Sequence, residues 1–269
     1  MGIGGILLAH RALKKLTLGL QHLVGAFISW KRVARLFHAA SRSQTEQAAS
    51  PASIAVSAAQ RQQNVNSVLF EASDLSFHYP QRREPVLRGC DLRIALGDRL
   101  LLEGPSGGGK STLVSLLTGL RSPQSGLLLL GGLDRVTLGS EGWRKRVSAA
   151  PQFHENHVFT GTLSFNLLMG RCWPPRLEDL EEAEAICGQL GLDDLLKRMP
   201  AGLLQMVGET GWQLSHGERS RLYIARALLQ GSDLVVLDES FASLDPENLR
   251  TALACVLERT RTLLVIAHP

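Results

Sequence analysis

A glycine-rich segment near the middle of the chain has the composition and spacing of a phosphate-binding loop. Glycines let the backbone curl so that several N–H groups face phosphate oxygens. In such loops the lysine reaches the β- and γ-phosphates, and the hydroxyl after it binds Mg²⁺. We therefore predict a nucleoside triphosphate site with Lys110 and Ser111 in these two roles. The segment fits G-x-x-x-x-G-K-[ST] and comprises Gly104, Pro105, Ser106, Gly107, Gly108, Gly109, Lys110, Ser111 and Thr112.

The flanking residues predict the two elements that such a loop needs. The apolar run 99–103 predicts a buried strand leading into the loop, and residues 111–117 predict a helix leading out of it. The N-terminus of that helix adds a partial positive charge facing the phosphates. A glycine-rich turn that merely precedes Lys-Ser is the structural alternative, and this strand–loop–helix context disfavours it.

A pair of carboxylates could supply the further metal ligand and the general base that the loop lacks. The apolar run 234–237 predicts a buried strand, and Asp238 and Glu239 come directly after it. At the end of the strand, Asp238 can orient Mg²⁺ through water. Glu239 can face the attacking water as a general base. An ordinary strand terminus is the alternative for Asp-Glu alone, but a phosphate loop in the same chain favours hydrolysis.

Further residues could complete such a site. Ser215 and Gly217 directly precede a helix-like run, 219–229, and could form a second anion site at its N-terminus, although a serine-capped helix would look the same. Tyr79 could stack on a purine ring. Gln152 comes after a predicted strand and could bring an amide oxygen to the metal. His268 ends another predicted strand and could contact a γ-phosphate, although Tyr79 and His268 taken singly could equally be structural.

Charge is distributed unevenly along the 269 residues. Residues 1–45 carry seven basic side chains and no acidic one, which leaves 22 basic against 25 acidic side chains in the remainder, a net charge of −3. A basic arm on a slightly acidic domain indicates contact with nucleic acid or with an anionic membrane surface. The apolar pattern of the arm favours the membrane.

The chain is predicted to have three regions. Residues 1–40 form a membrane-proximal helical segment, because large apolar residues recur there with helical period. Two interpretations stay open: an amphipathic surface or partner helix, or the cytoplasmic end of a membrane helix. Residues 41–67, rich in Ser, Ala and Gln, predict a flexible linker. The apolar residues of the first region are Leu16, Leu20, Leu23, Phe27, Trp30, Ala34 and Phe37.

Residues 68–269 predict an α/β fold, a phosphate-loop NTPase core with a mixed sheet. Short apolar runs at 234–237 and 263–266 are typical of strands buried on both faces. Between about 155 and 215 the strand pattern gives way to helical patterns, which predicts a helical subdomain. The four cysteines form no C-x-x-C pair, so we expect reduced thiols and no zinc site.

The order and spacing of these motifs resemble the ATP-binding cassette of ABC transporters, over about residues 68–269. The resemblance implies a Walker A loop at 104–112, an adenine-stacking Tyr79 and a Q-loop Gln152. It also implies a signature loop with Ser215 and Gly217, a D-loop at 243–245, and a switch His268. Asp238 and Glu239 would be the Walker B aspartate and the catalytic glutamate. Catalysis would then rest on Lys110, Glu239 and His268, ATP and Mg²⁺ would be bound, and Ser111, Gln152 and Asp238 would hold the metal.

The resemblance also implies partners and a place in the cell. Two cassettes would pair head to tail, as a homodimer or with a related half-transporter, so that each nucleotide lies between one Walker A loop and the other signature. Residues 207–211 resemble the X-loop of exporters, which contacts the transmembrane domain. We therefore expect ATP-driven export at the cytoplasmic face of the (inner) cell membrane and no nucleic-acid partner. The alternatives are a soluble ABC-type ATPase and a non-catalytic, ATP-gated module.

Two departures from the family pattern stand out. His216 replaces the first glycine of the usual LSGGQ signature, and Glu218 replaces its glutamine. Since the serine and the second glycine are present, we expect phosphate binding to be retained but tuned. The sequence stops at Pro269, one residue after His268, so we expect a cassette truncated at its C-terminus, within a fragment of a fused half-transporter.

Overall fold

The computed structural model describes Lys15, Gly19 and residues 68–82, 84–150 and 157–267. The chain divides into two units, Met1–Ser50 and Pro51–Pro269, and the fold described is that of the second. Apart from Lys15 and Gly19, the predicted N-terminal helical segment and linker lie outside the described residues and stay predictions. In the described part of the chain, no helix is both long enough and apolar enough to cross a bilayer.

One sheet is antiparallel and has three strands in the order β2-β1-β4. One face of this sheet packs on the core: Ala72 and Phe77 of the first strand are buried, whereas Glu71 and Ser73 are exposed. Phe70 and Leu75 point into that core and are fully buried. The strands are β1 (Val68–Phe77), β2 (Leu87–Ala95) and β4 (Ser125–Leu130).

A second sheet is parallel and has the order β3-β9-β8-β5. Because its strands run in one direction, all four carboxyl ends lie at the same edge, where open α/β sheets bind their ligands. The predicted strands 99–103, 234–237 and 263–266 are confirmed within a residue at each end. The strands are β3 (Arg99–Glu103), β5 (Val147–Ala150), β8 (Leu234–Asp238) and β9 (Thr262–Ala267).

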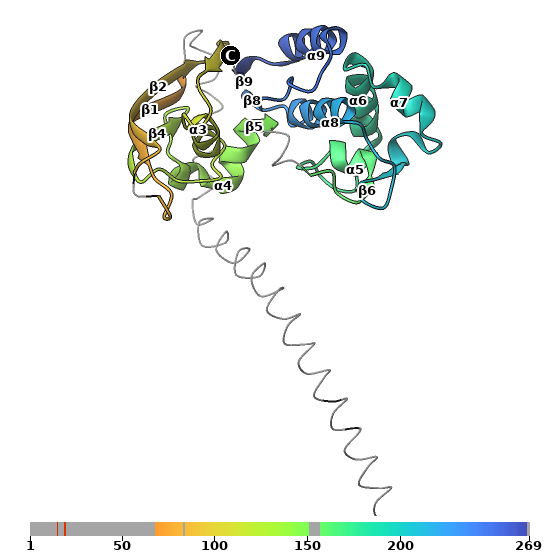
Figure 1. Ribbon diagram of the computed structural model, residues 1–269, viewed down its shortest axis with the longest axis horizontal. Coiled ribbons are helices and arrows are strands. Elements are labelled where there is room, and N and C mark those ends of the chain that lie inside the picture. The colour runs from red at the N-terminus through yellow and green to blue at the C-terminus, as the bar shows by residue number, and fades with distance from the viewer. Residues whose placement is uncertain (1–14, 16–18, 20–67, 83, 151–156, 268–269) are drawn as a thin grey trace, which may run out of the picture. The chain divides into compact units, whose positions relative to one another are not determined.

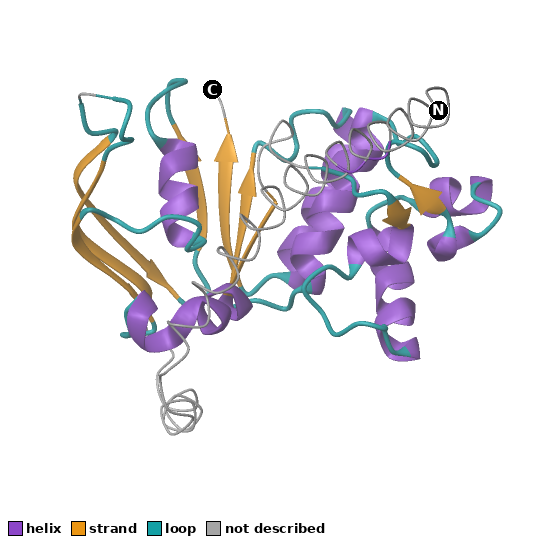
Figure 2. Cartoon of the chain, turned by 90° about the horizontal axis from the view of Figure 1, so that it is seen from below, coloured by secondary structure: helices purple, strands orange, loops and turns teal. Residues whose placement is uncertain are grey.

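Both faces of this parallel sheet are covered, as the continuous apolar runs predict. On β8, Leu234 and Val236 belong to a core shared with α3 (Lys110–Leu117) and the antiparallel sheet. Val235 and Leu237 belong to a second core formed with the helices. Helix α3 lies between the two sheets, whereas α8 (His216–Leu229) and α9 (Pro246–Arg259) cover the other face (Figures 1 and 2).

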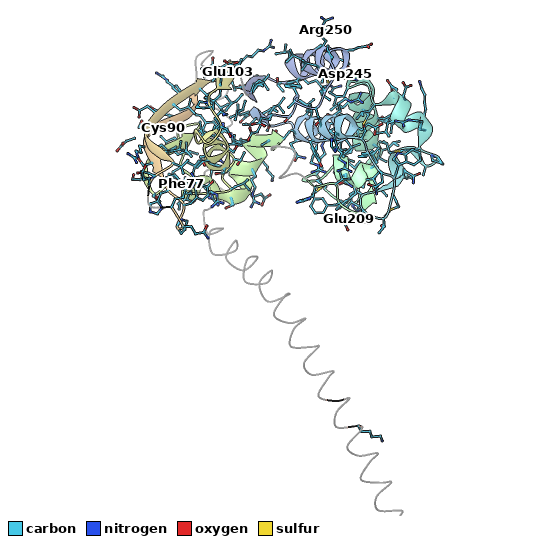
Figure 3. The ribbon with its side chains drawn as sticks, in the orientation of Figure 1. Phe77, Cys90, Glu103, Glu209, Asp245 and Arg250 are labelled. Atoms are coloured by element: carbon cyan, nitrogen blue, oxygen red, sulfur yellow. The ribbon has the colours of Figure 1, made fainter. Side chains whose placement is uncertain are left out.

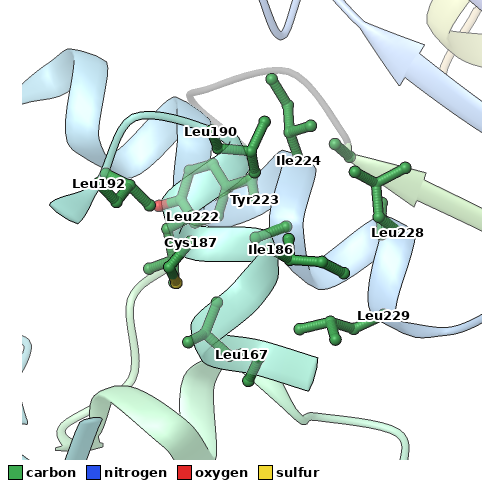
Figure 4. Packing of buried hydrophobic residues seen from close by; sticks show 14 of the residues in the cluster. Leu167, Ile186, Cys187, Leu190, Leu192, Leu222, Tyr223, Ile224, Leu228 and Leu229 are labelled. Carbon is green, nitrogen blue, oxygen red and sulfur yellow. The ribbon is translucent and has the colours of Figure 1, made fainter. Parts of the chain in front are cut away.

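The described residues between β5 and β8, 157–233, are largely helical, as predicted. Figure 4 shows its core, in which Leu167, Ile186 and Tyr223 pack together from different helices. One detail differs from the expectation: two very short strands, β6 (Gly161–Thr162) and β7 (Met206–Val207), pair inside this segment. The helices from here to the end of the fold are α5 (Leu163–Leu167), α6 (Leu177–Gln189), α7 (Asp193–Arg198), the 3₁₀ turn η2 (Gly202–Leu204), α8 (His216–Leu229) and α9 (Pro246–Arg259).

The cysteines are free thiols, as expected from their spacing. Cys187 lies inside the helical core, where burial raises the pKa of its thiol to about 12. A thiol with so high a pKa stays protonated at neutral pH and is a poor nucleophile. Cys187 is therefore a small core residue and not a reactive one.

Helix α4 (Arg135–Arg146) completes the fold beside the antiparallel sheet. Its N-terminus is capped by Asp134, whose carboxylate accepts a hydrogen bond from the Thr137 N–H at 2.9 Å. Gly139 interrupts it with a φ of 69°. The apolar pattern of this segment is weak, since only Trp143 is fully buried, which is why periodicity does not predict the helix.

Candidate nucleotide-binding site

The predicted phosphate loop connects β3 to α3, as the strand–loop–helix pattern requires. Gly107 and Gly109 have φ angles of 80° and 85°, in the left-handed region that glycine adopts without a Cβ clash. A turn closes within the loop, where the Gly108 N–H donates to the Pro105 carbonyl at 3.2 Å. Successive N–H groups in such turns form a concave anion-binding nest. The backbone of this loop thus has the shape that its sequence predicts.

Gly109 is fixed as glycine by its neighbours as well as by its backbone angle. A Cβ placed there would lie 3.0 Å from Cδ2 of Leu87 and 3.2 Å from Cγ1 of Val86. These side chains come from the segment that enters β2, so the loop packs directly on the antiparallel sheet. Any larger residue at position 109 would push the loop away from that sheet.

Lys110 opens α3 and turns back over the loop. Its Nζ donates hydrogen bonds to the carbonyls of Gly104 at 2.6 Å and of Pro105 at 2.9 Å. The ammonium group is therefore held above the loop, at the N-terminal end of α3, where the helix dipole also favours an anion. Positive charge and backbone donors converge on one point.

A pocket of about 410 Å³ lies over this loop. It brings together the phosphate loop and two residues that are distant in sequence, Tyr79 and Glu239. The arrangement joins an aromatic side chain, a set of backbone donors and a carboxylate in one cavity, as a nucleotide requires. The lining residues are Tyr79, Gln81, Arg82, Val86, Ser106, Gly107, Gly108, Gly109, Lys110, Ser111, Thr112 and Glu239.

Glu239 enters this pocket from the carboxyl end of β8. Its φ angle is 51°, a left-handed conformation that is uncommon for a residue with a side chain. Its backbone N–H donates to the Ile266 carbonyl of β9 at 3.0 Å, which ties this turn to the sheet edge. Strained backbone of this kind costs on the order of 1–3 kcal/mol and clusters at functional sites. This backbone conformation, together with its place in the pocket, makes Glu239 a candidate functional residue.

The oxygen donors beside the loop fit Mg²⁺. Ser111 offers a hydroxyl at the start of α3, and Asp238, only 2 % exposed, ends β8 immediately before Glu239. Mg²⁺ prefers hard oxygen donors and is usually held by one or two protein groups together with substrate phosphates and water. The described residues contain no cluster of three or more His, Cys, Asp or Glu side chains that could hold a metal alone.

Tyr79 lies just beyond the end of β1, beside the start of α3. Its hydroxyl shares a hydrogen bond of 3.2 Å with the Thr112 hydroxyl, which links the aromatic ring to the phosphate loop. Three pocket residues near it were missed by sequence reasoning: Gln81, Arg82 and Val86. The sequence signal that could have located these residues is the Tyr79-Pro80 pair. In the structure a short turn follows it, in which the Arg82 N–H donates to the Tyr79 carbonyl at 2.9 Å.

Two predicted site residues, Gln152 and His268, lie outside the described residues, and their roles stay predictions. The strands that precede them are described: β5 and β9 both flank β8 and end at the edge that carries Glu239. Neighbouring parallel strands bring the residues at their carboxyl ends to the same edge of a sheet. The topology is thus compatible with both expectations.

Ser215 and Gly217 do not line the pocket over the phosphate loop. Ser215 is the N-cap of α8, and its hydroxyl accepts a hydrogen bond from the Glu218 N–H at 3.2 Å. The predicted D-loop lies next to it, since the Ser243 and Ser220 hydroxyls share a hydrogen bond of 2.6 Å. The start of α8 is therefore joined to the segment after Glu239. Ser215 caps this helix, and the capped N-terminus lies apart from the pocket over the phosphate loop.

Glu218 is buried at this helix N-terminus and closes a capping box. Its carboxylate accepts a hydrogen bond from the Ser215 N–H at 2.7 Å and forms an ion pair with Arg198 of α7. Desolvation by burial is the largest influence on the carboxyl and acts to raise its pKa. Hydrogen bonds from Ser215 and Arg198 outweigh it and hold the pKa below the ordinary value of 4.5. Sequence reasoning identified the substitution but missed Arg198.

We predict that Glu218→Gln lowers the free energy of unfolding at pH 7 by about 1–2 kcal/mol, because Arg198 and Ser215 lose a charged acceptor. Since the folded-state pKa is depressed, this stabilisation is present above about pH 4.5 and is lost as the pH falls through the folded pKa. Urea unfolding at pH 7 and at about pH 3 should show the variant converging on the wild type in acid. Glu181→Gln, an exposed change on α6, is the control. A constant difference at both pH values would contradict the prediction.

The predicted X-loop, residues 207–211, begins at the buried Val207 of β7 and continues as a tight turn with Glu209 and Thr210 exposed. Gly208 has a φ of 98°, and a Cβ on Gly211 would lie 2.5 Å from the Met206 carbonyl. Gln213 braces the turn by donating from Nε2 to the Gly208 carbonyl at 2.9 Å. Glu209 is exposed at the surface of the helical part (Figure 3). The segment after Val207 is thus a braced turn with an exposed tip.

Comparison with known families agrees with this architecture. Residues 87–242 match the ABC transporter family, and the chain belongs to it. The match includes the phosphate loop, the start of α8 and the Asp238–Glu239 pair. The expected α/β phosphate-loop fold with a helical subdomain is confirmed.

Individual relatives are membrane transporters. The chain is 38% identical over 199 residues to the ABC multidrug transporter mdr4 of Aspergillus fumigatus, covering 72% of this chain and 15% of that protein. It is 36% identical over 200 residues to the ATP-dependent lipid A-core flippase of Salmonella typhimurium, covering 74% and 34%. A bacterial Atm1-family ABC exporter structure with ATP bound matches with a TM-score of 0.67 and 29% identity, covering 76% of this chain and 35% of that one. The chain thus spans about a third or less of these relatives.

Proposed function

We propose that this chain is the ATP-hydrolysing part of an ABC exporter, which couples ATP binding and hydrolysis to movement of a substrate across a membrane. The observation that carries the proposal is the pocket in which Tyr79, the phosphate loop and Glu239 meet. Family membership and the exporter relatives support the same assignment. In this proposal residues 1–40 are membrane-proximal, 41–67 are a linker and 68–269 are the ATPase domain.

The triphosphate of ATP would lie along the phosphate loop and the N-terminus of α3. Backbone N–H groups of residues 106–111 and the Lys110 ammonium would neutralise its charge. Tyr79 would stack on adenine at the other side of the pocket. To reach the phosphates, Lys110 would exchange its hydrogen bonds to Gly104 and Pro105 for charge-assisted bonds to phosphate oxygens.

Hydrolysis would depend on the edge of the parallel sheet. Glu239 would accept a proton from the attacking water, and its constrained turn would hold the carboxylate in line with the γ-phosphate. Ser111 and Asp238, with Gln152, would hold Mg²⁺, which offsets charge developing on the phosphate oxygens. His268 would contact the γ-phosphate.

The exposed surface of the helical part fits a partner domain. Phe159, Phe165 and Met206 are exposed around the X-loop, an arrangement typical of an interaction surface. We propose that this face contacts the transmembrane domain and that the cassette lies at the cytoplasmic side of the cell membrane. The apolar character of this face favours a protein partner over nucleic acid.

The second partner would be another cassette, an identical copy or a related half-transporter. Ser215 and Gly217 do not line the pocket of their own chain. In a head-to-tail pair they would complete the pocket of the other chain, with the N-terminus of α8 facing the γ-phosphate. ATP bound at the interface would hold the pair together, and its hydrolysis would release it.

Mixing two inactive variants tests both the hydrolysis and the pairing. Two separate variants of this chain are made. Lys110→Ala should impair the phosphate loop and leave the signature intact, whereas Ser215→Arg should block the signature and leave the phosphate loop intact. Each variant alone should release little phosphate from ATP. In a mixed head-to-tail dimer one site carries both defects and the other carries none, so the mixture should regain multiple-turnover hydrolysis. A wild-type chain without ATPase activity, or a mixture no more active than its components, would contradict the proposal.

A further inference from the structure

Two contacts hold the side chain of Tyr79. Its hydroxyl is bonded to Thr112 at 3.2 Å. The ring of Phe77, the last residue of β1, meets it edge-on, with centroids 5.1 Å apart and planes at 89°. Tyr79 lines the pocket over the phosphate loop whereas Phe77 does not, so part of the Tyr79 ring faces the pocket.

One face is covered by a cation. The guanidinium carbon of Arg121 lies 4.7 Å from the centroid of the Tyr79 ring and 5.9 Å from that of Phe77. Both distances are within the roughly 6 Å range of cation–π attraction. Neither Arg121 nor Phe77 lines the pocket over the phosphate loop. The guanidinium therefore approaches the Tyr79 ring from outside the pocket and leaves the pocket side to a ligand.

Arg121 is anchored to the phosphate-loop helix. Its backbone N–H donates to the Ser115 carbonyl of α3 at 2.9 Å. The chain reaches it through Gly119, whose φ of 70° ends the helix, and the Gly119 N–H donates to the Leu116 carbonyl at 3.0 Å. The position of the guanidinium is thus linked through α3 to the loop that would bind phosphates. Tyr79 is thus connected to α3 at two places: directly through Thr112 near the start of the helix, and through Arg121 beyond its end.

We infer that Arg121 is a positioning residue for the adenine base. This inference rests on the proposed ATP site. It adds to that site a stack of three layers: the Arg121 guanidinium, the Tyr79 ring and the purine. The cation fixes the angle of the ring and draws electron density from it, which strengthens stacking on an electron-rich purine. Because Arg121 lies outside the pocket, its contribution acts on the base through Tyr79 and not on the phosphates.

Calorimetric binding of ATP and of inorganic tripolyphosphate, both with Mg²⁺, to the full chain tests this role. Arg121→Ala should weaken ATP binding about threefold. Its affinity for tripolyphosphate should not change, because that ligand has no base to stack. Arg121→Lys keeps a cation over the ring and should recover most of the ATP affinity. In a Tyr79→Leu background, Arg121→Ala should cause no further loss, because the two residues act as one unit.

Arg250→Ala removes the same charge from an exposed position on α9 and is the control (Figure 3). An equal loss of ATP and tripolyphosphate affinity in Arg121→Ala would overturn the inference, because it would show a simple charge effect on the phosphates. If Arg121→Ala weakened ATP binding as much in the Tyr79→Leu background as in the wild type, the inference would be overturned as well. If the wild type bound tripolyphosphate as tightly as ATP, the adenine pocket itself would fail. If Arg121→Ala preferred ATP over tripolyphosphate as strongly as the wild type does, the role of Arg121 would be rejected and the proposed ATP site would stand.

Discussion

The Glu239→Gln variant is expected to hydrolyse ATP at least about a hundredfold more slowly than the wild-type chain, while ATP affinity stays within a factor of about two. Glutamine has nearly the same size and can adopt the same turn at φ 51°, so the pocket keeps its shape. It cannot accept the proton of the attacking water. The phosphate loop, which carries the binding, is unchanged.

Phosphate release under multiple turnover and equilibrium ATP binding, measured on the same preparation, would separate these two effects. Glu258→Gln, at an exposed position of α9, makes the same chemical change away from the pocket and should behave as wild type. Turnover of Glu239→Gln within a few-fold of wild type would exclude Glu239 as the base. Equal loss of binding and turnover would instead show that Glu239 shapes the pocket.

The segment after Glu239 connects this chemistry to the start of α8. The Ala242 N–H donates to the Glu239 carbonyl at 3.1 Å, so the turn continues from the strained residue. Ser243 then bonds to Ser220 of α8, and Asp245 caps α9 through the N–H groups of residues 247 and 248. Glu239 is therefore linked through a short series of hydrogen bonds to α8 and to the start of α9.

The centre of the site could be predicted from the sequence because its signals are local. Strand, loop and helix around Lys110 are contiguous, and each has its own pattern. The approach of Glu239 to the loop could also be predicted, since apolar runs buried on both faces indicate parallel strands whose ends share one edge. The family resemblance implied an adenine-stacking Tyr79, and in the structure Tyr79 lines the same pocket as the phosphate loop.

The contacts that were missed join residues far apart in the chain. Arg198 pairs with Glu218 from a different helix, and Arg121 covers Tyr79 from the loop after α3. Nothing in the residues beside Arg198 or Arg121 distinguishes these arginines from others on the surface, because their partners are chosen by the packing of the elements. Pairings of this kind depend on tertiary geometry, which periodicity and short motifs do not contain.

Trp143 contacts the end of the phosphate-loop helix from α4. The residue is 1 % exposed and packs edge-on against Phe70, with ring centroids 5.7 Å apart. Its indole Nε1 donates to the Leu117 carbonyl at 2.8 Å, and so binds the last turn of α3 to α4. The ring also lies against Gly119, where a Cβ would approach its Cδ1 to 2.9 Å. One side chain thus joins α4, β1 and the end of α3.

Trp143→Ala should therefore lower the free energy of unfolding by about 3–5 kcal/mol, through the cavity it leaves and the unpaired Leu117 carbonyl. Urea unfolding would measure the loss, and Trp173→Ala, at a side chain 57 % exposed, should change stability by only about 0.5 kcal/mol. Trp143→Phe keeps the ring but not the donor, so it should fall between wild type and alanine. Because α3 carries the phosphate loop, the alanine variant should also bind ATP more weakly under conditions where it is folded. A loss of stability no larger than that of Trp173→Ala would show that α3 is positioned by its contacts with the two sheets alone.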